Sequence, residues 1–180
     1  DLSSVLDFLK LSFTTLFSRD FWSRGEIPDE LRDLANGNSS AVTLRGNGGD
    51  DLLFTFGGAV RQEGGSGNDR MLSLGGVNVF FAGTGNDFMV AAGIRNEVAG
   101  EAGNDTAIVL GGDNEVDGGA GNDTLTVFGV NNDIDAGSGN DLVIALGGLN
   151  DVEGGTGDDD IFVGGGVNIV RAGDGADLVG

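Results

Sequence analysis

The sequence of 180 residues contains no cysteine and no histidine. The absence of cysteine excludes a disulfide framework and a thiolate metal site. The absence of histidine removes the commonest general base and the usual protein ligand of zinc. Neighbouring carboxylates such as Asp158, Asp159 and Asp160 are present, but they fall in or beside the positions of a repeat described below. We therefore predict that this chain is not an enzyme.

Basic residues are also scarce, because 9 Lys and Arg stand against 29 Asp and Glu, a formal net charge of −20. Nucleic acid is an unfavourable partner, since phosphate binding needs a basic surface. Multivalent cations are the natural counterpart. No stretch of about 18 apolar residues predicts a transmembrane segment. The chain begins at Asp1 without a secretory signal peptide, so we expect a mature piece, a fragment, or a protein exported by another route.

Proline is nearly absent, whereas glycine is abundant, with one Pro and 36 Gly. The glycines are unevenly distributed: 34 of them lie in residues 46–180. This change of composition predicts two parts, an N-terminal segment over residues 1–45 and a glycine-rich domain over residues 46–180. A segment with so strong a bias is searched first for internal repeats.

The glycine-rich domain repeats every 18 residues without insertion. Each repeat contains an aspartate, and a glycine stands two residues before it. The aspartates are Asp51, Asp69, Asp87, Asp105, Asp123, Asp141, Asp159 and Asp177. Between these turns lie two short apolar or alternating segments that are typical of strands. Two strands and two turns per repeat predict an all-β fold, a parallel β-roll or β-solenoid of about eight 18-residue coils.

The turn sequences carry a family resemblance. "GGSGNDRML", "GGAGNDTLT" and "GGTGDDDIF" resemble the RTX (repeats-in-toxin) nonapeptide Gly-Gly-x-Gly-x-Asp-x-U-x, in which U is a large apolar residue. The resemblance covers residues 46–180. It implies a calcium-binding parallel β-roll in a bacterial protein that is secreted or displayed on the cell surface, by type I export.

The resemblance also implies which residues hold calcium. The ions would lie between successive turns, held by the aspartate carboxylates and by main-chain carbonyls of nearby residues. The glycines concerned are Gly65, Gly67, Gly83, Gly85, Gly103, Gly119, Gly121, Gly137, Gly139, Gly155, Gly157, Gly173 and Gly175. Eight turns leave seven gaps and therefore hold up to about seven Ca²⁺. The alternative reading is that Gly-Asn-Asp only makes good turns.

The second half of each coil departs from the RTX pattern. It keeps the apolar position but loses the Gly pair, and asparagine replaces the aspartate at Asn78, Asn96, Asn114, Asn132, Asn150 and Asn168. We therefore expect an 18-residue, one-sided variant with calcium along one edge only. The asparagines are expected to form a structural ladder of stacked amides. Outward acids such as Glu115 and Asp133 are expected to form a solvated face.

One strand of each coil is apolar on both sides, which is typical of a covered sheet. The outward apolar residues form a predicted interface: Phe54, Phe56, Leu72, Leu74, Phe88, Val90, Ile108, Leu110, Phe128, Ile144, Leu146 and Phe162. The N-terminal segment has apolar residues near helical spacing and predicts an α-helix over residues 4–18. This helix would cap the N-terminal end of the solenoid or lie along part of the apolar stripe. A second short helix is predicted over residues 28–35.

These features predict an exported, calcium-dependent structural β-roll that acts as a rigid scaffold in a cell-surface protein, an adhesin or an extracellular assembly. The apolar stripe favours self-association or contact with further domains of the same protein. The alternative is a folding and export module of a secreted toxin or hydrolase. A second alternative is an ice-binding β-solenoid, which needs a regular column of outward threonines. Only Thr84 and Thr156 occupy the relevant position in the eight repeats.

Overall fold

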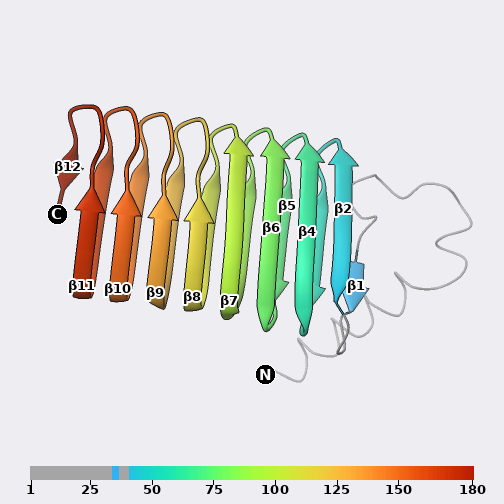
Figure 1. Cartoon of the computed structure of the whole chain (residues 1–180). Coiled ribbons are helices and arrows are strands. Elements are labelled where there is room, and N and C mark those ends of the chain that lie inside the picture. The colour runs from blue at the N-terminus through green and yellow to red at the C-terminus, as the bar shows by residue number, and fades with distance from the viewer. Residues whose placement is uncertain (1–33, 37–40) are drawn as a thin grey trace, which may run out of the picture.

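The chain folds into one parallel β-solenoid, seen in a computed structural model that describes residues 34–36 and 41–180 (Figure 1). Its strands are β1 (Leu34–Asn36), β2 (Val42–Gly48), β3 (Leu52–Phe56), β4 (Ala59–Ser66), β5 (Arg70–Leu74), β6 (Val77–Thr84), β7 (Phe88–Ala102), β8 (Thr106–Asp117), β9 (Thr124–Asp135), β10 (Leu142–Glu153), β11 (Asp160–Arg171) and β12 (Leu178–Val179). All pairs between them are parallel, and about eight coils stack along one axis. The predicted all-β solenoid is confirmed.

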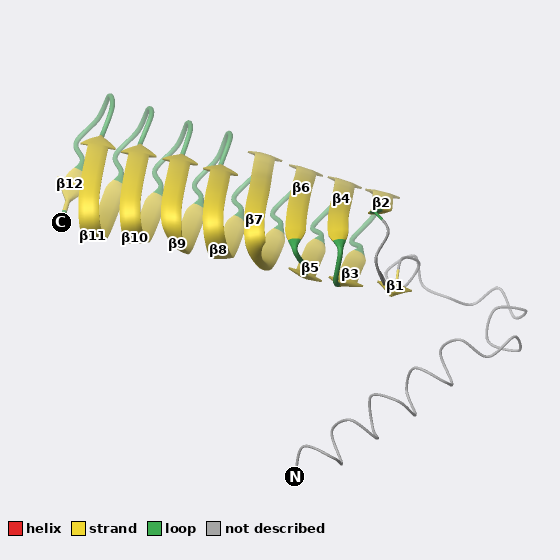
Figure 2. Ribbon diagram, turned by 60° about the horizontal axis from the view of Figure 1, so that its bottom comes forward, coloured by secondary structure: helices red, strands yellow, loops and turns green. Residues whose placement is uncertain are grey.

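Each coil has two sides. One side runs in the order β1-β3-β5-β7-β8-β9-β10-β11-β12, and β2, β4 and β6 form the start of the other side, which joins the first at β7. From β7 onward a single long strand supplies both sides, because it bends around one edge of the solenoid, whereas loops lie along the opposite edge (Figure 2). Partners in neighbouring coils are 18 residues apart, as Leu125, Val143 and Ile161 show. With coils about 4.8 Å apart, the rod is roughly 35 Å long.

The core lies between the two sides. The apolar position U of the nonapeptide, two residues after each aspartate, points into the core. It is filled by Leu53, Met71, Met89, Ala107, Leu125, Val143 and Ile161, all at most 1% exposed. On the opposite strand Val98, Val116, Ile134 and Val152 are buried to a similar degree. Val179 has the same predicted role but is 49% exposed, because β12 has a neighbour on one side only. Strand alternation therefore sets the core.

The first coils differ from the others in having polar side chains inside. Thr55, Gln62 and Ser73 are fully buried in positions that apolar residues take in later coils. The Gln62 amide donates to Thr55 Oγ1 at 3.0 Å and to the Leu72 carbonyl oxygen at 3.2 Å. These contacts link the two sides of the solenoid in its first coils.

The predicted helix over residues 4–18 lies outside the described residues. Within the second predicted helix, over residues 28–35, the described part is extended, because Leu34–Asn36 pairs with Phe54–Phe56 as strand β1. That part of the prediction was wrong: pairing with the solenoid edge outweighed local helix propensity. Among the described residues, no helix is long and apolar enough to span a membrane.

Candidate calcium-binding edge

The eight predicted aspartates form one continuous column along the loop-bearing edge, here called the Asp edge. The backbone N–H of each aspartate from Asp51 to Asp159 donates to Oδ1 of the aspartate one coil further on. The N···O distances run from 2.6 Å at Asp69 to 3.1 Å at Asp159. One carboxylate oxygen of each receiving residue is therefore fixed by the preceding coil.

The second carboxylate oxygen, Oδ2, is left without a donor. In Asp69, Asp87, Asp105, Asp123, Asp141 and Asp159 this atom is buried and has no hydrogen-bond partner. The residues themselves are 1% to 3% exposed. Buried polar atoms are nearly always satisfied, and an unsatisfied one costs about 1–3 kcal/mol, more when it is charged. A regular column of such atoms indicates that an electropositive partner belongs beside them.

The space next to Oδ2 is lined by another oxygen. A Cβ added at Gly118 would lie 2.8 Å from Asp123 Oδ2 and 2.4 Å from the Ala136 carbonyl oxygen. At Gly100 the corresponding distances are 2.6 Å to Asp105 Oδ2 and 2.4 Å to the carbonyl oxygen of the next coil. A carboxylate oxygen and a main-chain carbonyl oxygen therefore face the same narrow space.

Only glycine and alanine occur at this position in the eight coils, a regularity that the sequence analysis missed. The residues are Gly46, Gly64, Ala82, Gly100, Gly118, Ala136, Gly154 and Ala172. They stand five residues before each aspartate, where a constant small residue is a detectable signal. Larger side chains would collide with the carboxylate column.

Burial dominates the electrostatics of the column. It raises the pKa of Asp105 from 3.8 to about 7 and that of Asp123 to about 6. The backbone N–H of the preceding aspartate lowers these pKa values, while neighbouring carboxylates raise them further. Burial likewise raises the pKa of Asp69, Asp87 and Asp141. The ionised column is therefore costly until a positive charge compensates it.

The thirteen predicted glycines lie in the same turns, and all have a positive φ. Gly121 illustrates why the turn needs glycine: its φ is 133°, and an added Cβ would lie 1.9 Å from the Gly103 carbonyl oxygen. Its N–H donates to the Ser138 carbonyl oxygen at 2.7 Å. Glycine thus allows successive turns to stack closely. Two positions depart from glycine, since Asn47 and Glu101 adopt the same left-handed backbone with φ of 73° and 70°.

A second ladder on the Asp edge was not predicted. The residue before each aspartate is exposed, and its Oδ1 accepts the N–H of the equivalent residue one coil further on, as from Asn104 to Asn86 at 2.8 Å and from Asn122 to Asn104 at 2.7 Å. Asp50 and Asp158 take the same role at the two ends. The recurring asparagine in "GND" signalled this ladder, and its function is to bind turn to turn.

The oxygen-rich turns suit calcium. Among the described residues, no three His, Cys, Asp or Glu side chains converge on one point. A cation held here would therefore combine one or two carboxylates with main-chain carbonyl oxygens. Ca²⁺ accepts such mixed oxygen ligands in flexible geometry, whereas Mg²⁺ demands a tighter octahedron. The donor set at the Asp edge fits calcium.

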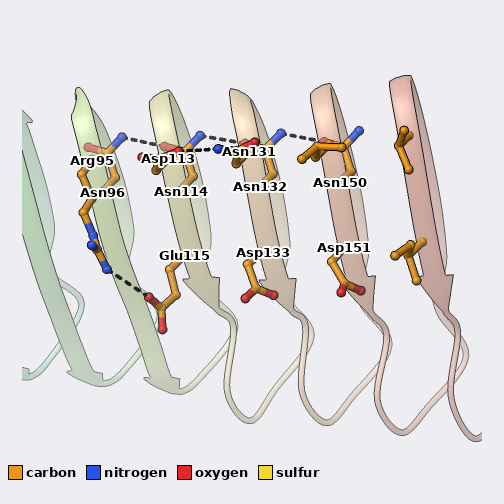
Figure 3. Close-up of a pocket in the computed structure, with 13 residues that line it drawn as sticks. Arg95, Asn96, Asp113, Asn114, Glu115, Asn131, Asn132, Asp133, Asn150 and Asp151 are labelled. Carbon is orange, nitrogen blue, oxygen red and sulfur yellow. Dashed lines mark hydrogen bonds and ion pairs between the residues drawn. The ribbon is translucent and has the colours of Figure 1, made fainter.

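The opposite edge, here called the Asn edge, contains a continuous ladder of side-chain amides (Figure 3). Nδ2 of each asparagine donates to Oδ1 of the next, at 2.7 Å from Asn96 to Asn114 and 2.8 Å from Asn114 to Asn132. The same Nδ2 of Asn114 also donates to the Phe128 carbonyl oxygen at 3.2 Å. Asn78 and Asn150 extend the ladder on either side. The expected structural ladder is therefore present.

Beside the Asn edge the outer face of β8 and β9 is acidic, whereas β11 carries Val167 and Ile169 there. Glu115 and Asp133 are exposed and register with each other, and Arg95 lies 3.8 Å from Glu115 (Figure 3). A shallow groove of about 440 Å³ runs across this face. Exposed ion pairs contribute little, so this face agrees with the expected solvated surface.

In a comparison with protein families, the chain matches the RTX calcium-binding nonapeptide repeat. The model of this family, which describes four copies of the repeat, matches residues 29–59, 63–93, 95–125, 129–161 and 144–179. No curated protein and no solved structure matches the chain. The matches cover well over half of the sequence and extend along the repeats that form the solenoid. The chain therefore belongs to the RTX calcium-binding nonapeptide repeat family.

Proposed function

We propose that this chain is a calcium-rigidified scaffold module of an exported protein, such as an adhesin or another extracellular structural protein. The observation that carries the proposal is the column of buried Oδ2 atoms along the Asp edge, which have no donor in six successive coils. RTX repeats bind calcium in general, and the acidic column gives this chain a reason to need it.

In this proposal each ion bridges two successive turns. The ligands are the column aspartates from Asp51 to Asp177, together with carbonyl oxygens of the positive-φ glycines between Gly65 and Gly175. The carbonyl oxygens that face Oδ2, such as that of Ala136, complete the set. Seven gaps hold up to seven Ca²⁺, which add fourteen positive charges and change the formal charge from −20 to −6. Since the ions bind the stacked turns and not the unfolded chain, binding free energy becomes folding free energy.

Calcium titration of the full chain tests this function. In chelator the chain is expected to lose most of its β-sheet circular dichroism, and millimolar Ca²⁺ is expected to restore it. Calorimetric titration should give a stoichiometry of up to seven. A chelated chain that keeps its full β signal and binds no calcium would contradict the proposal.

Two matched variants locate the ions. Asp105→Asn replaces a column carboxylate by an amide of the same shape and should reduce the stoichiometry by one or two. Asp133→Asn makes the same change on the exposed acidic face and should leave the stoichiometry unchanged. Equal effects of both variants would mean that calcium binds as a diffuse counterion and not in the turns.

The scaffold role is tested by shape. With calcium, small-angle scattering should show a rigid rod whose solenoid part is roughly 35 Å long. Attached globular domains would connect to its ends. A chain that remains expanded in saturating calcium would not act as a rigid spacer.

A further inference from the structure

The outer side of the strands next to the Asp edge forms a largely apolar surface, here called the apolar face. Its outward columns also contain the polar residues Arg70, Thr106, Thr124, Thr126 and Asp160. All twelve residues of the predicted interface lie on it, in register from coil to coil. Seven are between 37% and 45% exposed: Phe56, Leu74, Phe88, Leu110, Phe128, Leu146 and Phe162. The opposite outer face carries acids such as Glu115 and Asp133 at the comparable positions of the middle coils, and apolar residues such as Val167 and Ile169 in β11.

The apolar face is large for a monomer. Its strands are about five residues, or roughly 17 Å, wide, and the stack is roughly 35 Å long, which gives about 600 Å². That value lies at the upper limit of the apolar patches that monomers usually expose, about 300–600 Å². Patches of this size are often functional.

Strand β1 shows where the N-terminal segment joins the solenoid. Leu34–Asn36 pairs with Phe54–Phe56, so the chain enters at the edge of the sheet that bears the apolar face. The core beside this strand is already closed, since Leu53 is 1% exposed. The N-terminal end of the core therefore needs no further cover, whereas the apolar face is still exposed to solvent.

Thirty-three residues precede β1, and the first part of them matches the face chemically. Residues 2–21 have apolar side chains near helical spacing at Leu2, Val5, Leu6, Leu9, Phe13, Leu16, Phe17 and Phe21. As a helix, residues 4–18 would measure about 22 Å and cover four or five coils that are about 4.8 Å apart. The segment is long enough for one half of the apolar face.

We infer that residues 2–21 pack in cis on the half of the apolar face nearest β1, over β3, β5, β7 and β8. The twelve residues from 22 to 33 connect this segment to β1. Such a connection reaches about 40 Å when fully extended and about 20 Å on average as a random coil. The half of the face nearest β1 lies within the average reach.

A second copy of the chain is the weaker occupant. Two apolar faces in contact would bury about 1,200 Å² in total, the lower limit of stable interfaces. The N-terminal segment is instead tethered to the face, and tethering by a short connection gives effective concentrations in the millimolar range. The cis cover is therefore favoured at ordinary protein concentrations.

Trp22, the single tryptophan of the chain, adjoins the covering segment and reports on it. In the full chain with millimolar calcium, acrylamide quenching of Trp22 should be at least threefold weaker than in urea. Leu74→Asp should raise the quenching two- to threefold, because Leu74 lies on the covered half and is 45% exposed without the cover. Circular dichroism must show that the β-roll persists in the variant.

Two matched substitutions are the controls. Leu146→Asp lies in the same side-chain column on the distal half, and Leu149→Asp lies on the opposite outer face; the two leucines are 43% and 50% exposed. Neither change should alter Trp22 quenching. Full quenching in the unsubstituted chain, release by either control, or no release by Leu74→Asp would overturn the inference. A dimer by light scattering with concentration-dependent protection would assign the face to a second copy and overturn it too. The circular dichroism signal separates these outcomes from a failure of calcium-dependent folding.

Discussion

The two edges of the solenoid solve the same stacking problem with nearly the same side chain. On the Asp edge and the Asn edge, a buried residue with one branched polar group recurs every 18 residues, at 1% exposure for Asp105 and 4% for Asn114. The asparagine amide carries a donor and an acceptor, so each Asn edge residue satisfies its neighbour. The carboxylate has acceptors only, and from Asp69 to Asp159 its second oxygen, Oδ2, receives no hydrogen bond.

The comparison shows that one atom decides whether an edge depends on a ligand. Exchanging an NH₂ group for an oxygen removes two donors and adds a negative charge. The Asn edge therefore closes without outside help, whereas the Asp edge needs a positive charge between coils. In a solenoid with one edge of each kind, the need for calcium is therefore confined to the Asp edge.

The strongest way to break the comparison is to place a carboxylate in the Asn edge. Asn114→Asp removes the donor to Asn132 Oδ1 and to the Phe128 carbonyl oxygen. Asn96 Nδ2 still donates to one oxygen of the new carboxylate, but the other oxygen faces these two acceptors. An uncompensated buried charge costs about 3–5 kcal/mol. Urea unfolding in millimolar calcium should show a loss of stability of that size.

Asn122→Asp is the matched control for this prediction. Asn122 belongs to the exposed ladder of the Asp edge, where Asp50 and Asp158 occupy equivalent positions. Its side chain acts there as an acceptor, which a carboxylate also provides. The change should cost less than about 0.5 kcal/mol. Equal losses in the two variants would show that the buried amide ladder has no special role.

The sequence predicted those features of the edges that depend on the repeat alone. An invariant 18-residue period places Asp105 over Asp123 and Asn96 over Asn114, and strand alternation places Leu125 inside and Phe128 outside. The Asp and Asn columns therefore follow from spacing. The glycines of the Asp edge, such as Gly121, also follow from the sequence, because a tight turn needs residues with a positive φ.

Other features depend on contacts that spacing does not specify. The exposed ladder that contains Asn122 could not be predicted, because the sequence does not show which neighbouring coil a side chain contacts. In this ladder the side-chain acceptor lies in the coil that precedes the N–H donor. Strand β1 overrides a local helical pattern because Leu34–Asn36 finds a free edge on Phe54–Phe56. The burial of polar side chains in the first coils also depends on tertiary contacts, since Gln62 is buried where its amide can donate to Thr55.

Acid offers a second, smaller way to test the difference between the edges. Burial raises the pKa of Asp105 to about 7 and that of Asp123 to about 6, so the folded calcium-free chain binds protons more tightly than the unfolded chain. By linkage, stability is gained as the pH falls from about 7 toward the unfolded pKa of 3.8 and is lost as the pH rises through 7. In chelator, the β-sheet circular dichroism signal should therefore become stronger as the pH is lowered from 8 to 5.

Calcium should reverse this trend. Protons compete with the metal for the same carboxylates, so the calcium-loaded chain should lose ions and stability as the pH falls. Exposed carboxyl groups ordinarily titrate near pH 4, so the window from pH 7 to pH 5 reports on the buried column. A chelated chain with less β structure at pH 5 than at pH 8 would argue against the raised pKa values.

The smallest effect concerns the backbone of the Asp edge. Glu101 holds a φ of 70° at a turn position where Gly83 and Gly119 stand in the adjacent coils. A left-handed backbone costs a non-glycine residue about 1–2 kcal/mol, a cost that glycine avoids. Glycine in turn loses about 0.5–1 kcal/mol on folding, because its unfolded chain has more conformational entropy. Glu101→Gly should therefore stabilise the calcium-loaded roll by about 0.5–1 kcal/mol, measured by urea unfolding.

Ala102→Gly, one residue further on, separates backbone strain from glycine content. Ala102 is not among the residues with positive φ, so glycine brings only its entropic cost there and should destabilise by about 0.5–1 kcal/mol. Opposite signs at adjacent positions would show that the Asp edge stores strain at Glu101. If Glu101→Gly instead destabilises the roll, the Glu101 side chain must make a contribution larger than the strain it imposes. The natural place for that contribution is the calcium turn itself, and a reduced calcium stoichiometry in the variant would identify it.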